Sequence, residues 1–180
     1  MASSFFLNSS TIGVDLNNGN ATALFTVGTH VLGSSDTEWV YVQAGTSING
    51  NSVCAFNSGT FTCSMASAAD TGIPGLQVCV SQTSISAQAF GWVAIRGVGL
   101  SVAVQGTTTL TGVMYIGGTA AGSGKGDTTT GCFTNNITAS GTVFGCVIIS
   151  TTQSATATGS GFNLGNFNLN FPRTNAAGMA

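Results

Sequence analysis

Hydrophobic and polar residues alternate along much of the chain, and the pattern is densest in residues 88–97, QAFGWVAIRG. The residues from Trp92 to Arg96 alternate between the two faces of an extended strand, and Val93 and Ile95 lie on the face opposite Trp92. A period of two is typical of a strand that buries at least one face. We therefore expect the centre of a β core here, and no chemistry in it.

A glycine marks a change of phase directly after this stretch. Beyond Gly97, four apolar residues share the parity of Trp92, namely Val98, Leu100, Val102 and Val104. Glycine at such a switch predicts a corner or a β-bulge where one strand passes to another.

The same alternation predicts further strands on both sides of this centre. Residues 38–44 place Trp39, Tyr41 and Gln43 on one face, and they echo residues 92–95 too briefly to establish a repeat. Residues 64–70 are the one stretch that tolerates a helix, for one or two turns at most. Strands are also predicted at residues 21–27, 76–81, 107–116 and 143–151, with turn-forming residues between them.

The C-terminal tail carries an amphipathic strand of its own. A slip of phase at residues 165–166 divides its alternating residues into Phe162 and Leu164, then Phe167, Leu169 and Phe171. The pattern predicts one strand with a bulge or two short strands, which Pro172 is expected to end. After a flexible linker, such a strand either folds back onto its own sheet or completes a neighbour's sheet.

These patterns predict an all-β fold, a compact antiparallel sandwich or barrel with extended N- and C-terminal arms. Residues 1–20 are interpreted as the N-terminal arm and residues 21–151 as the β core domain. Residues 152–180 are a linker and a C-terminal arm, whose strand is a candidate for exchange between protomers. The candidate core anchors are Trp39, Tyr41, Trp92 and Ile95.

Composition narrows the classes of function. Only 4% of the 180 residues are charged, against roughly 25% in ordinary domains, so Ser, Thr, Asn and Gly must keep the surface wet. Removing water from such a surface costs little free energy, which favours its burial against other proteins. The net charge of −2 and the absence of a Lys or Arg cluster argue against nucleic-acid binding. No apolar run approaches the roughly 20 residues of a transmembrane helix, and the first residues make a poor signal peptide, so we expect no membrane association.

Candidate chemistry is sparse. His30 is the single histidine, and Asp36 and Glu38 are interpreted as a solvated rim. The sequence contains no nucleophile elbow, zinc-protease or P-loop pattern, so we expect a protein that is not an enzyme, with no catalytic, cofactor-binding or metal-binding residues. The five cysteines are an odd number, and Cys54 and Cys63 either form a disulfide or remain buried free thiols.

Arg96 is the charge of most interest in the predicted core strand. One interpretation places it at a buried or interfacial position, paired with a carboxylate or with backbone carbonyls. The other packs its aliphatic stem along the sheet and leaves its guanidinium in solvent. The sequence leaves both open.

Two stretches carry a resemblance to a known family. Residues 27–48, VGTHVLGSSDTEWVYVQAGTSI, and residues 80–99, VSQTSISAQAFGWVAIRGVG, resemble the capsid decoration, or cement, proteins of tailed double-stranded DNA bacteriophages. The resemblance spans a little under half of the chain, and the cysteines and the amphipathic tail depart from the family pattern. It implies a small β-rich protein, made in the bacterial host cytoplasm, that assembles as a homotrimer on the outer surface of an icosahedral shell.

The function expected from this resemblance is that of a structural virion protein, which bridges subunits of the major capsid protein and stabilises the capsid. The alternative is a trimeric tail-associated module for receptor binding or adhesion, which would also be β-rich and poor in charge. The candidate contacts with the capsid or with other protomers are Arg96, Phe162, Leu164, Phe167, Leu169 and Phe171.

Overall fold

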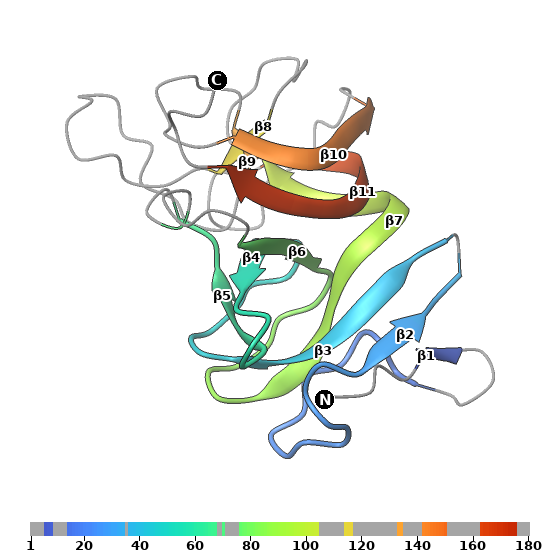
Figure 1. Cartoon of the computed structure of the whole chain (residues 1–180), viewed down its shortest axis with the longest axis vertical. Helices are drawn as coiled ribbons and strands as arrows, with labels where there is room; N and C mark the ends of the chain where they lie inside the picture. The colour runs from blue at the N-terminus through green and yellow to red at the C-terminus, as the bar shows by residue number, and fades with distance from the viewer. Residues whose placement is uncertain are drawn as a thin grey trace.

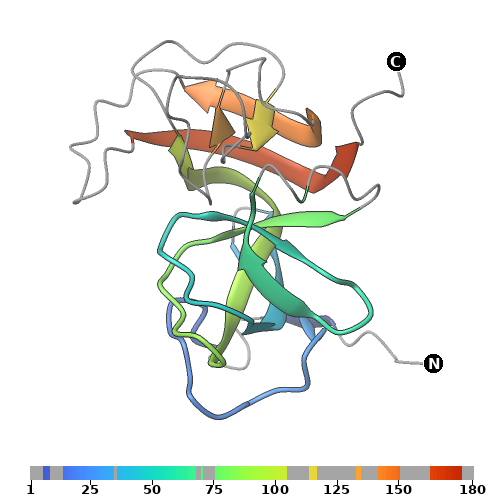
Figure 2. The same cartoon turned by 90° about the vertical axis from the view of Figure 1, so that its left-hand side faces the viewer.

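The computed structural model describes the backbone of residues 6–8, 14–34, 36–67, 70, 76–104, 114–116, 133–134, 142–150 and 163–175. It describes side chains over residues 14–34, 36–67, 70, 76–103 and 168–170. These residues form an all-β fold, as the alternation predicts, and contain no α-helix (Figures 1 and 2). Their strands are β1 (Phe6–Asn8), β2 (His30–Leu32), β3 (Glu38–Ala44), β4 (Val53–Phe56), β5 (Thr62–Met65), β6 (Gln77–Ser81), β7 (Phe90–Val104), β8 (Met114–Ile116), β9 (Phe133–Thr134), β10 (Thr142–Ser150) and β11 (Asn163–Asn175).

Five of these strands close into a barrel. β3 pairs with β5, β5 with β4, β4 with β6, β6 with β7, and β7 returns to β3. The β3–β5 pair is parallel and the other four pairs are antiparallel. A closed ring leaves no free strand edge along its circumference, which removes the hydrogen-bonding groups that would otherwise recruit another chain.

All five strands contribute to one buried cluster, which therefore fills the barrel interior. The alternation of β3 and β7 explains this, because Val40 and Val93 point inward while Trp39 and Trp92 point outward. Two connecting segments close one end of the barrel through a backbone bridge between Ile48 and Ile85. The interior residues are Val40, Val42, Ala44, Ile48, Cys54, Phe56, Cys63, Cys79, Ile85, Ala89, Val93 and Ile95.

A second ring of strands adjoins the barrel and shares β7 with it. β7 pairs with β11, β11 with β10, β10 with β8, and β8 with β9, all antiparallel. β9 then returns to β7 through a parallel pair between Val104 and Phe133. Figures 1 and 2 show β7 running from one group of strands into the other.

The passage of β7 between the two rings occurs around Gly97. The pairing register shifts once against β3, where Ile95 is the extra residue, and once against β11, just beyond Gly97. Gly97 and Gly99 both have positive φ angles, of 154° and 73°. The bulge predicted from the change of phase is therefore present, within one continuous strand. The second shift also explains why Val98 is exposed, while Leu100 is buried.

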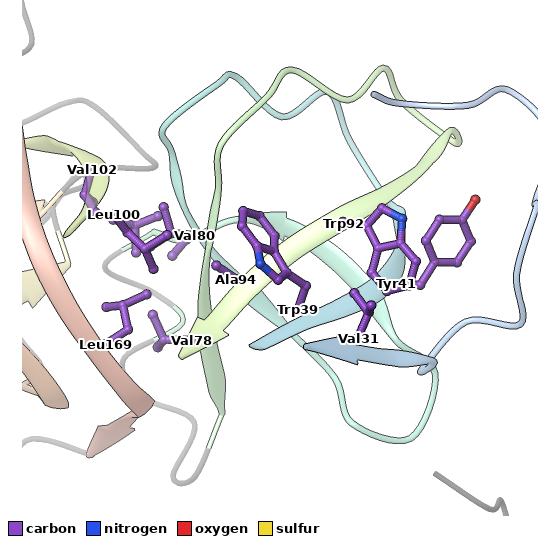
Figure 3. Packing of buried hydrophobic residues seen from close by; sticks show 12 residues of the cluster. Val31, Trp39, Tyr41, Val78, Val80, Trp92, Ala94, Leu100, Val102 and Leu169 are labelled. Atoms are coloured by element: carbon purple, nitrogen blue, oxygen red, sulfur yellow. The ribbon is translucent and has the colours of Figure 1, made fainter. Parts of the chain in front are cut away.

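The outward faces of β3 and β7 pack in a second cluster, shown in Figure 3. Phe25, from the segment before β2, contacts Tyr41 with ring centroids 5.4 Å apart and Trp92 with centroids 5.3 Å apart. Tyr41 and Trp92 are themselves 4.9 Å apart. Toward the second ring the same cluster continues through Val80 and Leu100 to Leu169 of β11 (Figure 3).

Residues 21–27 form turns and bends, so the strand predicted there is wrong. Two of their backbone groups bond elsewhere: the Leu24 amide donates to the Tyr41 hydroxyl, and Thr26 O accepts from the Thr29 amide. Pairing with β3 is taken by β2 instead, in register from His30 with Val40 to Leu32 with Glu38. The short β1 then pairs with β2 in parallel.

The tail strand β11 pairs with β7 and with β10 of the same chain. It continues to Asn175, so the expectation that Pro172 ends the strand is wrong. Against β10, the register shifts between the pairs Phe144–Arg173 and Cys146–Leu169, so Pro172 lies in a bulge. Proline is tolerated at a bulge because no ladder hydrogen bond requires its missing N–H.

Candidate functional site

Four of the chain's few ionisable residues gather at one end of the first barrel. His30 begins β2, Glu38 begins β3, and Asp36 lies in the turn that joins these strands. Arg96 of β7 is brought opposite Glu38 by the β3–β7 register. Distant parts of the sequence thus place two acids, one arginine and the histidine at the junction of the two rings.

Glu38 forms the inner pair of this group with His30. The Glu38 carboxylate lies 2.8 Å from the Nδ1 atom of His30 and is only 7% exposed, whereas the His30 side chain is 21% exposed. A buried carboxylate needs a hydrogen-bonding partner, which β2 provides from a position diagonal to Glu38 in the register. The interpretation of Glu38 as part of a solvated rim is therefore wrong, because its side chain is buried.

Arg96 and Asp36 form the outer pair. The Arg96 guanidinium contacts the Asp36 carboxylate, and both side chains are exposed. Arg96 thus combines the two arrangements that the sequence left open, because it pairs with a carboxylate at the surface. Asp36 has a φ angle of 57°, a left-handed conformation that Asp tolerates better than most residues.

Hydrogen bonds fix the turn that holds Asp36. Thr37 Oγ1 donates to Ser34 O at 2.7 Å and accepts from Trp39 Nε1 at 3.0 Å. The Gly33 amide donates to Thr37 O at 2.8 Å. The buried Trp39 therefore anchors the turn to the core. These hydrogen bonds fix the backbone that carries Asp36, and so they position its carboxylate for the ion pair with Arg96.

Three cysteines meet inside the first barrel. Cys54, Cys63 and Cys79 are free and buried, and the Sγ atoms of Cys63 and Cys79 lie 3.8 Å apart. Of the two arrangements left open for Cys54 and Cys63, the structure shows free thiols. Hydrogen bonds from Cys63 and Cys79 lower the pKa of Cys54 to about 5, while burial raises the pKa of Cys79. The hydrogen bond to Cys54 raises the pKa of Cys63.

The structure distributes the candidate contact residues unevenly. Arg96 is at the surface, whereas Leu169 is buried in the cluster between the two rings. Leu164, Phe167 and Phe171 are described in their backbone only, as part of β11, and Phe162 lies outside the described residues. The four core anchors, Trp39, Tyr41, Trp92 and Ile95, are all buried.

Exposed apolar residues lie close to Arg96 in the pairing register, and sequence reasoning missed them. Leu32 pairs with Glu38, which in turn pairs with Arg96, and Val98 follows Arg96 by two residues along β7. Leu32 is 42% exposed and Val98 is 53% exposed. Alternation groups Val98 with residues that are buried, such as Leu100. The sequence contains no local signal for the second register shift of β7, so it could not predict that Val98 is exposed.

Within the part of the chain that the structure describes, no group of three or more His, Cys, Asp or Glu side chains is arranged to hold a metal ion. The same residues include no helix of the length and apolarity that a membrane crossing requires. No protein-family model matches the sequence, and neither a curated protein nor a solved structure matches the chain significantly.

Proposed function

We propose that the protein is a structural virion protein that decorates an icosahedral bacteriophage capsid. It acts as a homotrimer on the outer surface of the shell and bridges subunits of the major capsid protein. In this role it needs no cofactor and catalyses no reaction.

The observation that carries the proposal is the position of the two stretches that resemble cement proteins. Residues 27–48 contain β2 and β3, and residues 80–99 contain the end of β6 and the first part of β7. β3 and β7 pair over the register from Glu38–Arg96 to Gln43–Phe90. Stretches that lie far apart in the sequence thus form one continuous wall of the barrel. That the two stretches form one structural unit is what supports the proposal.

The surface chemistry supports the same function. The chain has three basic and five acidic residues, so most of its polar surface consists of hydroxyl and amide groups. Burying such groups against a partner costs less free energy than burying charges. The centres of protein interfaces are depleted in charge for this reason. Several copies that each make modest contacts then bind a repeating shell through avidity.

We place the contact with the shell at a surface that we name the Arg96 corner, defined by Leu32, Asp36, Arg96 and Val98. It combines exposed apolar side chains with an arginine whose geometry is fixed by an ion pair. Arginine beside apolar anchors is enriched where interfaces bind most tightly. The braced turn beneath it reduces the conformational entropy that binding would cost.

Binding to purified shells tests this placement. Val98→Asp adds a charge to an exposed position, so the protein should still fold, yet decorate shells at least about tenfold more weakly. Leu24→Asp is the matched control, because Leu24 is also exposed but lies in the segment before β2. Equal binding by both variants would remove the Arg96 corner from the proposal. Shells that do not bind even the unaltered protein would contradict the function itself.

Copy number separates this function from its alternative. A cement protein should occur in the purified particle at a ratio near one to one with the most abundant virion protein, and its loss should leave heads fragile to heat or osmotic shock. A few copies that fractionate with tails would favour the adhesion module. Absence from the particle would contradict both.

A further inference from the structure

The two rings of strands have the same topology, and we infer that the chain contains one barrel unit twice, in tandem, with β7 shared between the copies. In each ring the first strand pairs in parallel with the third, and the remaining pairs are antiparallel. The third strand pairs with the second, the second with the fourth, the fourth with the fifth, and the fifth with the first. β3, β4, β5, β6 and β7 thus correspond to β7, β8, β9, β10 and β11.

The neighbour outside each ring also corresponds. β2 runs antiparallel along the first half of β3, next to the position where β5 joins the second half. β6, which precedes β7 as β2 precedes β3, runs antiparallel along the first half of β7, and β9 joins the end of β7. The relation of β2 to β3 is therefore the relation of β6 to β7. A repeat that begins one strand before each ring explains both arrangements.

Short similar sequences occur at the parallel strand pair of each ring. Residues 40–46 read VYVQAGT and residues 102–107 read VAVQGT, at the end of each first strand. Residues 59–62 read GTFT and residues 131–134 read GCFT, and each includes residues of a third strand. The echo between residues 39–42 and 92–95 joins the first and fifth strands of one ring, so it does not belong to this repeat.

The register of the parallel pair agrees with this alignment. In the first ring Gln43 pairs with Thr62, and in the second ring Val104 pairs with Phe133. The sequence similarity aligns Gln43 with Gln105 and Thr62 with Thr134. In this alignment Val104 and Phe133 correspond to the residues directly before Gln43 and Thr62, so both rings have the same register. A slip of one residue would turn every side chain to the opposite face of its strand, so a shared register is a strong constraint.

A tandem repeat explains why β7 is so long. Its first part closes one barrel and its last part opens the next, so each unit packs against its neighbour without a linker. This last step rests on the proposed function: one chain would present two similar barrels to a repeating shell. The contacts of the two barrels would then add through avidity.

The repeat makes a specific prediction for a residue outside the described part of the chain. In the first ring the Gln43 amide donates to Phe61 O at 3.1 Å. The repeat predicts the equivalent bond in the second ring, from the Gln105 backbone amide to the Phe133 carbonyl. Scalar coupling across hydrogen bonds, measured by NMR on the intact isotope-labelled chain, detects such a bond directly. The Gln43–Phe61 coupling in the same spectrum is the matched control.

We expect a coupling between Gln105 N and Phe133 C′, and slow amide exchange at Gln105. A coupling from Gln105 to any other carbonyl would overturn the repeat. Fast hydrogen exchange at the Gln105 amide, at the rate of an unprotected amide, would also overturn the repeat. Slow exchange without a coupling to Phe133 would do the same, provided that the Gln43–Phe61 coupling is resolved in the same spectrum. The experiment contains no shell, so its failure leaves the proposed function intact.

Discussion

Glu38 Oε1 lies 2.8 Å from His30 Nδ1, and the carboxylate is buried next to β2. A pair of this kind is sensitive to the loss of either partner, because the group that remains is desolvated and loses a hydrogen bond. The neighbouring pair between Asp36 and Arg96 is exposed on both sides and therefore contributes much less to stability.

Glu38→Ala should lower the free energy of unfolding by about 1 to 3 kcal/mol, because the half-buried His30 loses its hydrogen bond to the Glu38 carboxylate. Glu38→Gln retains an acceptor oxygen and should cost less. The matched control is Asp36→Asn, which removes the exposed ion pair, keeps the left-handed turn conformation, and should cost less than about 1 kcal/mol. Urea denaturation of the three variants measures the differences. Equal effects of Glu38→Ala and Asp36→Asn would show that burial of Glu38 is not decisive.

The glycines at the junction of the rings offer a second comparison. A Cβ atom at Gly97 would lie 2.6 Å from Thr37 Cγ2, whereas a Cβ at Gly99 would meet no atom within 4 Å. Gly99→Ala should therefore cost only the positive φ angle, about 1 to 2 kcal/mol. Gly97→Ala adds a clash with the turn and should cost more, so its thermal unfolding temperature should be lower. If Gly99→Ala proved the more damaging variant, the junction would be packed differently.

The alternation of hydrophobic and polar residues predicts two paired strands of the first barrel, β3 and the first part of β7. Residues 38–44 and the strand around Trp92 are strands with inward valines and outward aromatic residues, because a period of two assigns each side chain to a face. The pattern carries no information about which strands become neighbours. It therefore predicted a sandwich or a barrel without distinguishing them, and it missed the parallel β3–β5 pair that closes the ring.

Sequence reasoning failed where long-range pairing overrides local preference. Residues 21–27 have a strand-like composition, but β2 occupies the edge of β3, and the Leu24 amide donates to the Tyr41 side chain instead of to a neighbouring strand. Charged residues are usually solvated, but Glu38 is buried and pairs with His30, which the sequence separates from it by eight residues. The register shift that exposes Val98 depends on β11, which lies more than sixty residues away in the sequence.

Access, and not acidity, should control the reactivity of the barrel thiols. The thiolate is the reactive form of cysteine, and the pKa of Cys54 is lowered to about 5 by Cys63 and Cys79. All three thiols are nevertheless buried, so alkylation requires the barrel to open. Their reaction with iodoacetamide, followed by peptide mass spectrometry, should be at least about a thousandfold slower in the native protein than in denaturant. Rapid native labelling of Cys54 would contradict the closed barrel.

Trp92 should be among the most important residues for stability. It is 1% exposed and contacts both Phe25 and Tyr41. Trp92→Ala should lower the free energy of unfolding by about 3 to 5 kcal/mol, because it removes one of the two tryptophans of the cluster on the outward faces of β3 and β7 and leaves a cavity. Leu24→Ala, at an exposed position in the adjacent segment, is the control and should change stability by less than about 0.5 kcal/mol. Similar melting temperatures for the two variants would misplace the core.

Leu169 distinguishes a strand that folds back within its chain from one that is exchanged between protomers. It is 3% exposed and lies in the cluster that joins β11 to the first barrel. Leu169→Ala should lower the free energy of unfolding by about 2 to 5 kcal/mol.

The concentration dependence of that variant carries the decision. With β11 in its own chain, the difference in unfolding midpoint between Leu169→Ala and the unaltered protein should stay the same when both are diluted a hundredfold. An exchanged strand makes the burial of Leu169 depend on association, so dilution should increase that difference. Unfolding curves recorded for both proteins at both concentrations measure it. Dilution lowers the midpoint of any trimer, so only a difference that grows on dilution would show that β11 completes a neighbour's ring.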